Sequence, residues 1–297
     1  MWTFLNQLID GLILSGPILL IAVSLSAVLA SSRVLNVAIG ASYALVAVVC
    51  LEVEPSVGVA GVIVIGLFGP VVIFLLMDTI VLSIQRRQSR DPVMGSFAAT
   101  LGVSLILTAV AAMITSSATL SLPPNFLRLG TDWKIGGLQV PEDGTVVVGA
   151  AAAALVAFWL LLYHTSLGAQ FRATASDPFL AKVAGIRPGY VIRLSWVVSG
   201  LFCGVATILL LIVDRTVSST SGSDILLVPF AAVIAGGMGS PLGAALASVF
   251  FGVAEALLTL VTSSGGLQSV LVFGILFVLL VVRPEGLSSA SKGTRAY

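Results

Sequence analysis

Acidic residues inside long uncharged stretches are the clearest candidates for functional side chains in this chain. Glu255 is the most isolated of them, since it follows thirty uncharged residues and precedes twenty-seven more. An acidic side chain within a membrane span is costly to bury and is a candidate functional group by default. Glu255 is therefore either a contact for a small solute or a residue that bonds to a neighbouring span for packing alone.

The chain lacks the residue clusters that catalysis, metal binding or nucleotide binding require. Its two cysteines, Cys50 and Cys203, each lie in an apolar stretch, and its one histidine, His164, follows another. No G-x-x-x-x-G-K-[ST] phosphate-binding loop occurs in the sequence. We therefore expect no enzyme, no metal site and no cofactor.

The composition indicates an integral membrane protein. Charged residues make up 9% of the 297 residues and hydrophobic residues 58%, against about 25% and about 45 to 50% in a soluble domain. Several uncharged runs reach the roughly 20 residues that span a bilayer as a helix. We expect an all-α polytopic transmembrane bundle, one domain over residues 1–297, and not a soluble enzyme, a nucleic-acid-binding protein or an outer-membrane barrel.

Breaks in hydropathy predict eight full spans and one short segment. The short segment, 226–238, cannot cross a bilayer as an ideal helix, which predicts a broken or re-entrant element surrounded by protein. The full spans are expected near residues 8–30, 34–51, 57–84, 93–117, 146–163, 191–213, 240–263 and 267–282.

The basic residues orient these spans. With the N-terminus outside, 11 of the 14 Lys and Arg residues fall on the cytoplasmic side, as the positive-inside rule requires. We therefore expect an extracytoplasmic N-terminus and a cytoplasmic C-terminus. Segment 118–145 then becomes an outer loop, either a covering lid or a docking surface for an external binding protein, and segment 165–193 becomes a cytoplasmic loop.

The cytoplasmic loop contains a candidate short helix. Asp177 is suited to cap its N-terminus, Pro178 to occupy its first position and Gly185 to end it. Its apolar face would comprise Phe179, Leu180, Val183 and Ala184. Because so short a helix is unstable alone, the pattern predicts either an ordinary connector or a knob that another protein receives.

Five motifs, in order along nearly the whole chain, resemble permease subunits of branched-chain amino acid ABC importers. The cytoplasmic run SLGAQFRATASDPFLAKVAGI resembles the cytoplasmic loop of that family. The other four motifs are Asn-x-Ala-x-Gly at 36–40, TLGVSLIL at 100–107, FAAVIAGGMGSPLG at 230–243 and Arg-Pro-x-Gly-Leu at 283–287. The length and brief tail resemble the shorter of the two permease types that pair in these importers.

This resemblance implies ATP-driven import of a small polar solute across the inner membrane of a prokaryote. It implies three kinds of partner, namely a second permease subunit, two cytoplasmic ATP-binding subunits that hydrolyse ATP, and an external solute-binding protein. The implied coupling residues are Asp177, Pro178, Leu180, Ala181, Val183, Ala184, Gly185 and Ile186. The expected translocation path includes Asn36, Gly40, Thr100, Ser104, Gly236, Gly237, Gly239 and Glu255.

Several alternatives stay open at this point. Many family members have a His before the glycine of the Asn-containing motif, where this chain has Ile39, and relatives also carry urea, short amides and small carboxylates. The glycines of the expected path are equally suited to close helix packing. A stand-alone secondary transporter or channel is the alternative function, with Glu255 as nearly its only deep ionisable group, and an intramembrane enzyme would need a cluster of catalytic side chains that the spans lack.

Overall fold

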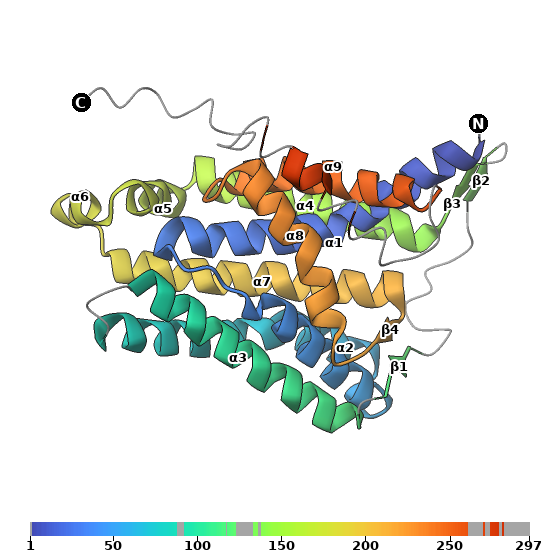
Figure 1. The fold of residues 1–297 in the computed structure, drawn as a ribbon, viewed down its shortest axis with the longest axis horizontal. Coiled ribbons are helices and arrows are strands. Elements are labelled where there is room, and N and C mark those ends of the chain that lie inside the picture. Colours follow the sequence, from blue (N-terminus) through green and yellow to red (C-terminus); the bar gives the residue numbers. More distant parts are fainter. Residues whose placement is uncertain are drawn as a thin grey trace.

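The long apolar runs form helices in the computed structural model of the protein (Figure 1). The structure describes residues 2–87, 92–116, 118–122, 133–135, 138–260, 270, 274–278 and 281. The long helices are α1 (Trp2–Ser32), α2 (Ala38–Arg87), α3 (Pro92–Thr115), α4 (Glu142–His164), α7 (Pro188–Asp214) and α9 (Pro241–Leu258). The shorter helices are α5 (Ser166–Ser176), α6 (Pro178–Val183) and α8 (Ser221–Gly236). Two small antiparallel pairs join β1 (Leu120–Ser121) to β4 (Thr216–Val217) and β2 (Trp133–Ile135) to β3 (Leu138–Val140).

The prediction of an all-α polytopic bundle is confirmed. In the described part of the chain, six helices are long and apolar enough to cross a membrane, fewer than the eight spans expected, for two reasons. The expected spans 34–51 and 57–84 are joined in α2, and the expected span 267–282 and the motif at 283–287 lie largely or wholly outside the described residues. The expected short segment corresponds to α8, an apolar helix of 16 residues.

α2 consists of two arms that run in opposite directions. A straight helix of its 50 residues would be about 75 Å long, more than twice the thickness of a bilayer core. The backbone leaves the helical conformation at Gly58, where φ is 64° and ψ is −173°, a conformation that glycine adopts without strain. Cys50 before this turn then lies 3.6 Å (Sγ to O) from Val62 after it, and Gly69 lies against Val46. We call residues 38–57 the first arm and residues 59–87 the second arm.

Glycines of α7 bring it into close contact with the second arm of α2. Gly200 and Gly204 are four residues apart and face the same neighbour. A Cβ atom on Gly204 would lie 2.3 Å from the carbonyl oxygen of Leu67, and one on Gly200 would lie 2.7 Å from the Cα of Val71. Small residues at such spacing let membrane helices approach until their backbones touch.

Serine side chains fasten α7 to α1 on its other side. The hydroxyl oxygens of Ser24 and Ser199 are 2.6 Å apart, and those of Ser31 and Ser195 have the same separation. All four residues are buried. Because lipid tails are as apolar as the side chains, hydrogen bonds and close packing rather than the hydrophobic effect hold spans together. α1 and α7, the spans with the largest buried shares, thus form the core of the bundle.

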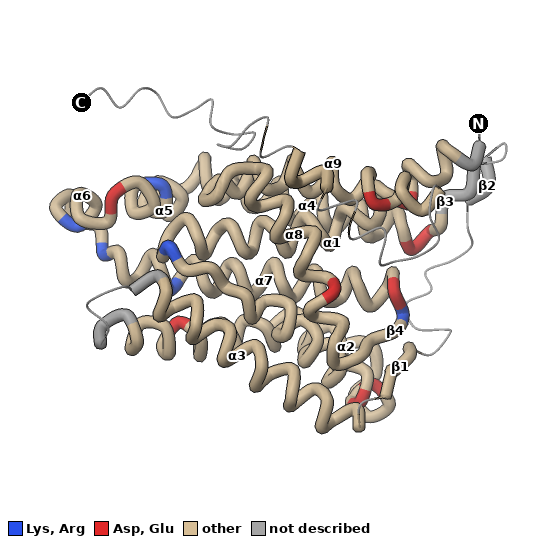
Figure 2. The backbone as a smooth tube through the Cα atoms, viewed as in Figure 1, with Lys and Arg blue, Asp and Glu red and all other residues tan. Residues whose placement is uncertain are grey.

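Charged residues gather at the two ends of the bundle (Figure 2). Lys and Arg gather at the end that carries α5 and α6, which we call the basic end. Asp and Glu gather mostly at the opposite end, near β1, β4 and the start of α1, which we call the acidic end. The middle of the bundle is almost free of charge, as a bilayer core requires.

Replacing Gly204 by alanine is expected to destabilise the protein, because the new methyl group would overlap the backbone at Leu67. Overpacking of this kind costs about 1 to 3 kcal/mol, so the Tm in detergent, followed by circular dichroism, should fall. Gly149→Ala is the matched control, since no atom lies within 4 Å of its added Cβ. Equal Tm values for the two variants would contradict the close packing of α7 on α2.

Candidate functional site

α6 begins where its sequence signals place it. The Asp177 carboxylate accepts hydrogen bonds from the backbone N–H groups of Phe179 at 2.8 Å and Leu180 at 3.1 Å. Pro178 occupies the first helical position, where its lack of an N–H leaves no donor unsatisfied. The start of α6 is therefore fixed by local chemistry within four residues.

α6 ends in a Schellman motif at Gly185. The φ of this glycine is 82°, its N–H donates to the carbonyl oxygen of Lys182 at 3.1 Å, and the N–H of Ile186 donates to that of Ala181 at 3.0 Å. These two bonds define the motif. Because α7 starts at Pro188, this turn leads from α6 directly into the central helix.

The apolar face of α6 is exposed at the basic end. Phe179, Leu180 and Val183 are exposed over 73%, 62% and 73% of their surfaces, and we call these three side chains the apolar knob. Ala181 points the other way and is buried, with 4% exposed. Of the remaining predicted coupling residues, Pro178, Ala184 and Gly185 are exposed, and Asp177 and Ile186 are half-buried. Figure 1 shows that α6 protrudes from the bundle, and an exposed apolar surface outside the spans suits contact with another protein.

A break in the helices lies deep in the bundle, just before α2. Residues 33–37 are not helical, and Asn36 among them is fully buried. Its Oδ1 accepts a hydrogen bond from the N–H of Ala38 at 3.2 Å, while its Nδ2 has no partner among the described residues. The carbonyl oxygen of Ile39 faces Cys203 at 3.8 Å, which is close to the middle of α7. α2 therefore starts about halfway along the bundle, a break that a membrane tolerates only where protein surrounds it.

α3 contributes one buried and one more open position beside this break. The hydroxyl of buried Thr100 donates to the carbonyl oxygen of Leu35 at 3.0 Å. One turn further along α3, Ser104 is half-buried, and no atom lies within 4 Å of a Cβ built on Gly102. The structure thus brings Thr100 of α3 against the non-helical segment that contains Asn36.

Two glycines of the expected path lie at helix crossings. A Cβ on Gly40 would lie 2.1 Å from the carbonyl oxygen of Gly222 on α8, and one on Gly236 would lie 2.3 Å from the carbonyl carbon of Gly243 on α9. Both distances are far below van der Waals contact. These two positions have the geometry of close helix packing rather than of an open lining.

The turn between α8 and α9 holds the other two glycines. Gly237 and Gly239 have φ values of 97° and 88°, which residues with a Cβ rarely adopt. Ser240 then caps α9, accepting a hydrogen bond from the N–H of Gly243 at 3.2 Å. The glycines therefore shape a tight reversal that joins two apolar helices.

Glu255 lies near the acidic end of the bundle, not halfway along it. α9 ends three residues later, at Leu258, and the side chain of Gln7, close to the start of α1, donates a hydrogen bond to the hydroxyl of Thr259. Glu255 is half-buried. Its carboxyl group thus lies within the last turn of a span, where the interface is within reach.

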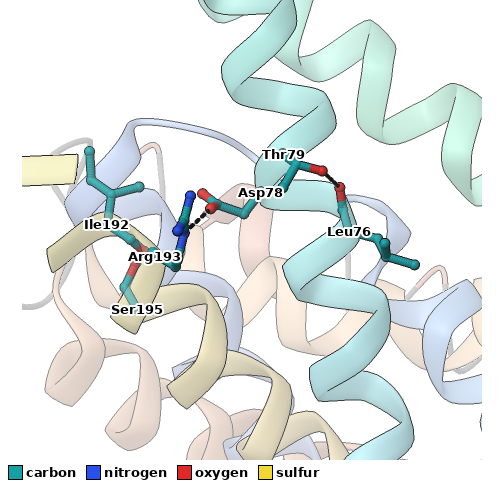
Figure 3. Close-up of polar contacts among 6 residues, drawn as sticks. All are labelled: Leu76, Asp78, Thr79, Ile192, Arg193 and Ser195. Carbon is teal, nitrogen blue, oxygen red and sulfur yellow. Dashed lines mark hydrogen bonds and ion pairs between the residues drawn. The ribbon is translucent and has the colours of Figure 1, made fainter. Parts of the chain in front are cut away.

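The structure also shows an ion pair that sequence reasoning missed. Asp78 on the second arm of α2 accepts a hydrogen bond from Nε of Arg193 on α7 at 3.2 Å (Figure 3). The Asp78 side chain is 1% exposed and that of Arg193 58%. The one signal available was that Asp78 is the only charged residue between Glu54 and Arg86. Among the described residues, no group of three or more His, Cys, Asp or Glu side chains is placed to hold a metal ion.

Comparison with known proteins identifies the family. Residues 7–281 match the family described as "Branched-chain amino acid transport system / permease component". The chain belongs to this permease family. The permease is 29% identical to the "Probable branched-chain amino acid transport permease protein LivH" of Methanocaldococcus jannaschii, over 95% of this chain and 92% of that protein. It is 24% identical to the "High-affinity branched-chain amino acid transport system permease protein LivH" of Escherichia coli, over 96% and 95% of the two chains.

A solved structure has a similar fold. The permease aligns with a chain of "PsaBC from Streptococcus pneumoniae in complex with Fab" with a TM-score of 0.53 and 19% identity, over 96% of this chain and 94% of that chain. At this identity the likeness concerns the arrangement of helices alone.

Replacing Gly185 by alanine is expected to loosen the end of α6, because a Cβ at this positive φ costs roughly 1 to 2 kcal/mol. Hydrogen–deuterium exchange of the purified permease should show faster amide exchange between Phe179 and Ile186. Gly189→Ala is the control, as its added Cβ meets no atom within 4 Å and its φ is not among the positive ones. Unchanged exchange in Gly185→Ala would contradict the Schellman motif.

Proposed function

We propose that this permease is one membrane subunit of an ATP-driven importer of branched-chain amino acids. It works beside a second permease subunit, two cytoplasmic ATP-binding subunits and an external solute-binding protein. The apolar knob on α6 is the observation that carries this proposal. α6 is capped at both ends and joined to the central helix α7 by a short connection. Its exposed apolar face is therefore suited to transmit a movement of another protein to α7.

The coupling element comprises residues 177–186. Because the sequence has no phosphate-binding loop of its own, the energy of ATP reaches the permease through a contact surface. A free helix of six residues would not persist in water, but the Asp177 cap, the turn at Gly185 and the buried Ala181 hold α6 in place. A preformed knob loses little conformational entropy on docking into a groove of an ATP-binding subunit.

The basic end of the bundle is its cytoplasmic end. The gathering of Lys and Arg around α5 and α6 (Figure 2) supports this orientation, since cytoplasmic loops carry the excess of basic residues. α1 starts at the opposite, acidic end, so the N-terminus is extracytoplasmic. ATP-binding subunits then meet the knob in the cytoplasm, and the solute-binding protein docks at the acidic end.

The solute passes the break before α2. A helix that starts midway through a membrane presents N–H groups and a partial positive charge to a carboxylate. The unpartnered Nδ2 of Asn36 adds a donor, and half-buried Ser104, one turn along α3 from Thr100, adds a hydroxyl. This set of donors favours an amino acid over urea or a simple amide, because neither of those has a carboxylate. A movement of segment 33–37 away from its neighbours would expose this set of donors to the solute.

Aspartate at both Leu180 and Val183 is expected to abolish docking of the ATP-binding subunits, because two charges would enter an apolar contact. Those subunits should no longer copurify, and uptake of radiolabelled L-leucine into vesicles should fall by at least about tenfold. Val57→Asp makes the same kind of change at an exposed residue near the α2 turn, at the opposite end of the bundle, and should leave copurification of the ATP-binding subunits unaltered. Normal copurification and uptake in the double variant would refute the coupling role, and a wild-type complex without L-leucine uptake would refute the solute.

Labelling of single cysteines tests the orientation. Cys50 and Cys203 are both buried, with 0% exposed, so the wild-type protein should react little with a membrane-impermeant maleimide. In intact cells, Glu52→Cys is expected to react and Lys182→Cys to react only after the membrane is opened, because both side chains are exposed but on opposite sides. The reverse pattern would invert the proposed topology.

A further inference from the structure

We propose that Asp78 and Arg193 are positioning residues that carry the movement of α6 into the second arm of α2. This inference rests on the proposed function and adds a route for the mechanical signal within the subunit. Figure 3 shows the pair, with Asp78 on α2 directed at the guanidinium of Arg193 on α7.

The route begins with the short connection between α6 and α7. Residues 184–187 separate the two helices, and the Schellman bonds at Gly185 hold this connection in one conformation. Arg193 lies five residues after Pro188, which is about 8 Å along α7. A displacement of the apolar knob therefore acts on the turn of α7 that carries Arg193.

The pair can transmit a displacement of α7 to α2 because Asp78 has no other charged partner than Arg193 among the described residues. Its side chain is 1% exposed, its Oδ2 is held by Arg193 at 3.2 Å, and its Oδ1 has no hydrogen-bond partner among the described residues. Separating the pair would leave a buried carboxylate without a compensating charge, which is strongly unfavourable. When Arg193 moves, the second arm of α2 must follow.

The exposure of Arg193 makes the link adjustable. With 58% of its side chain exposed, its guanidinium is uncovered on one side and can turn with Asp78 as the helices shift. Two residues along α7, Ser195 bonds to Ser31 of α1 at 2.6 Å. α7 is thus attached to α1 and to the second arm of α2 within a single turn, soon after the coupling element in the chain. One movement at α6 therefore reaches α1, which precedes the break before α2, and the arm that packs against the first arm of α2, which follows the break.

The test uses the full importer complex, copurified through this permease and reconstituted in liposomes. ATP hydrolysis and uptake of radiolabelled L-leucine are measured together, and the readout is leucine taken up per ATP hydrolysed. Asp78→Leu is the main variant, since an apolar side chain of similar size suits this buried site, and the partner that it leaves, Arg193, is 58% exposed and does not become a buried unpaired charge. Thr79→Val is the control, because Thr79 is exposed next to Asp78 and its hydroxyl donates to the carbonyl oxygen of Leu76 in its own helix at 2.7 Å (Figure 3).

For Asp78→Leu we expect leucine uptake per ATP to fall about tenfold, a typical coupling magnitude, with unchanged Tm and unchanged copurification of the ATP-binding subunits. Arg193→Gln should give the same loss, Arg193→Lys a smaller one, and Asp78→Leu with Arg193→Gln no further loss, since the pair acts as one unit. Thr79→Val should keep the wild-type ratio, since its hydroxyl bonds within one helix and links no two helices.

A wild-type ratio in Asp78→Leu, or an equal loss in Thr79→Val, would overturn the inference and leave the proposed function standing. So would a double variant whose loss is the product of the two single losses. If the wild-type complex took up no leucine, the proposed function would fail and this inference with it.

Discussion

A polar group that leaves water for a bilayer must find its partner inside the protein, and this requirement determines where the helices of the permease meet. The buried serines of α1 bond to those of α7, and Thr100 of α3 bonds to the non-helical segment before α2. Asp78 of α2 bonds to Arg193 of α7. Each of these contacts fixes one helix against another at a single height. The helices therefore have a defined register along one another, which nonspecific apolar packing alone would not give.

α7 is the helix through which these contacts connect. One side carries Gly200 and Gly204 against α2, and another carries serines against α1. Its first turns follow the capped helix α6 after four residues. The element that is exposed to a partner and the element that holds the core together are thus continuous in sequence. In a close-packed bundle, such continuity turns a local displacement into a movement of whole helices.

Local features of this permease could be predicted from its sequence, and contacts between distant segments could not. The ends of α6 follow from Asp177, Pro178 and Gly185, because capping depends on residues within one turn. The apolar runs predicted most spans, since length and hydropathy decide insertion. The partnership of Asp78 with Arg193, 115 residues away, has no local signal, and neither has the contact of Gly40 with Gly222. The expected spans 8–30 and 34–51 left a break between them, but the position of that break halfway along the bundle depends on contacts between distant segments.

The sharp turn at Gly58 also bears on how the chain assembles during synthesis. Contacts across it, such as Cys50 to Val62, join residues made almost together, so the two arms of α2 can enter the membrane as a preformed hairpin. Ser199, the partner of Ser24, is synthesised 175 residues later. Until then, no hydroxyl of α7 is available to bond with the serines of α1. The Oγ of Ser31 lies 3.2 Å from the carbonyl oxygens of Ala27 and Val28 in its own helix. The hydroxyl of Ser31 in newly made α1 is therefore satisfied within its own helix before α7 reaches the membrane.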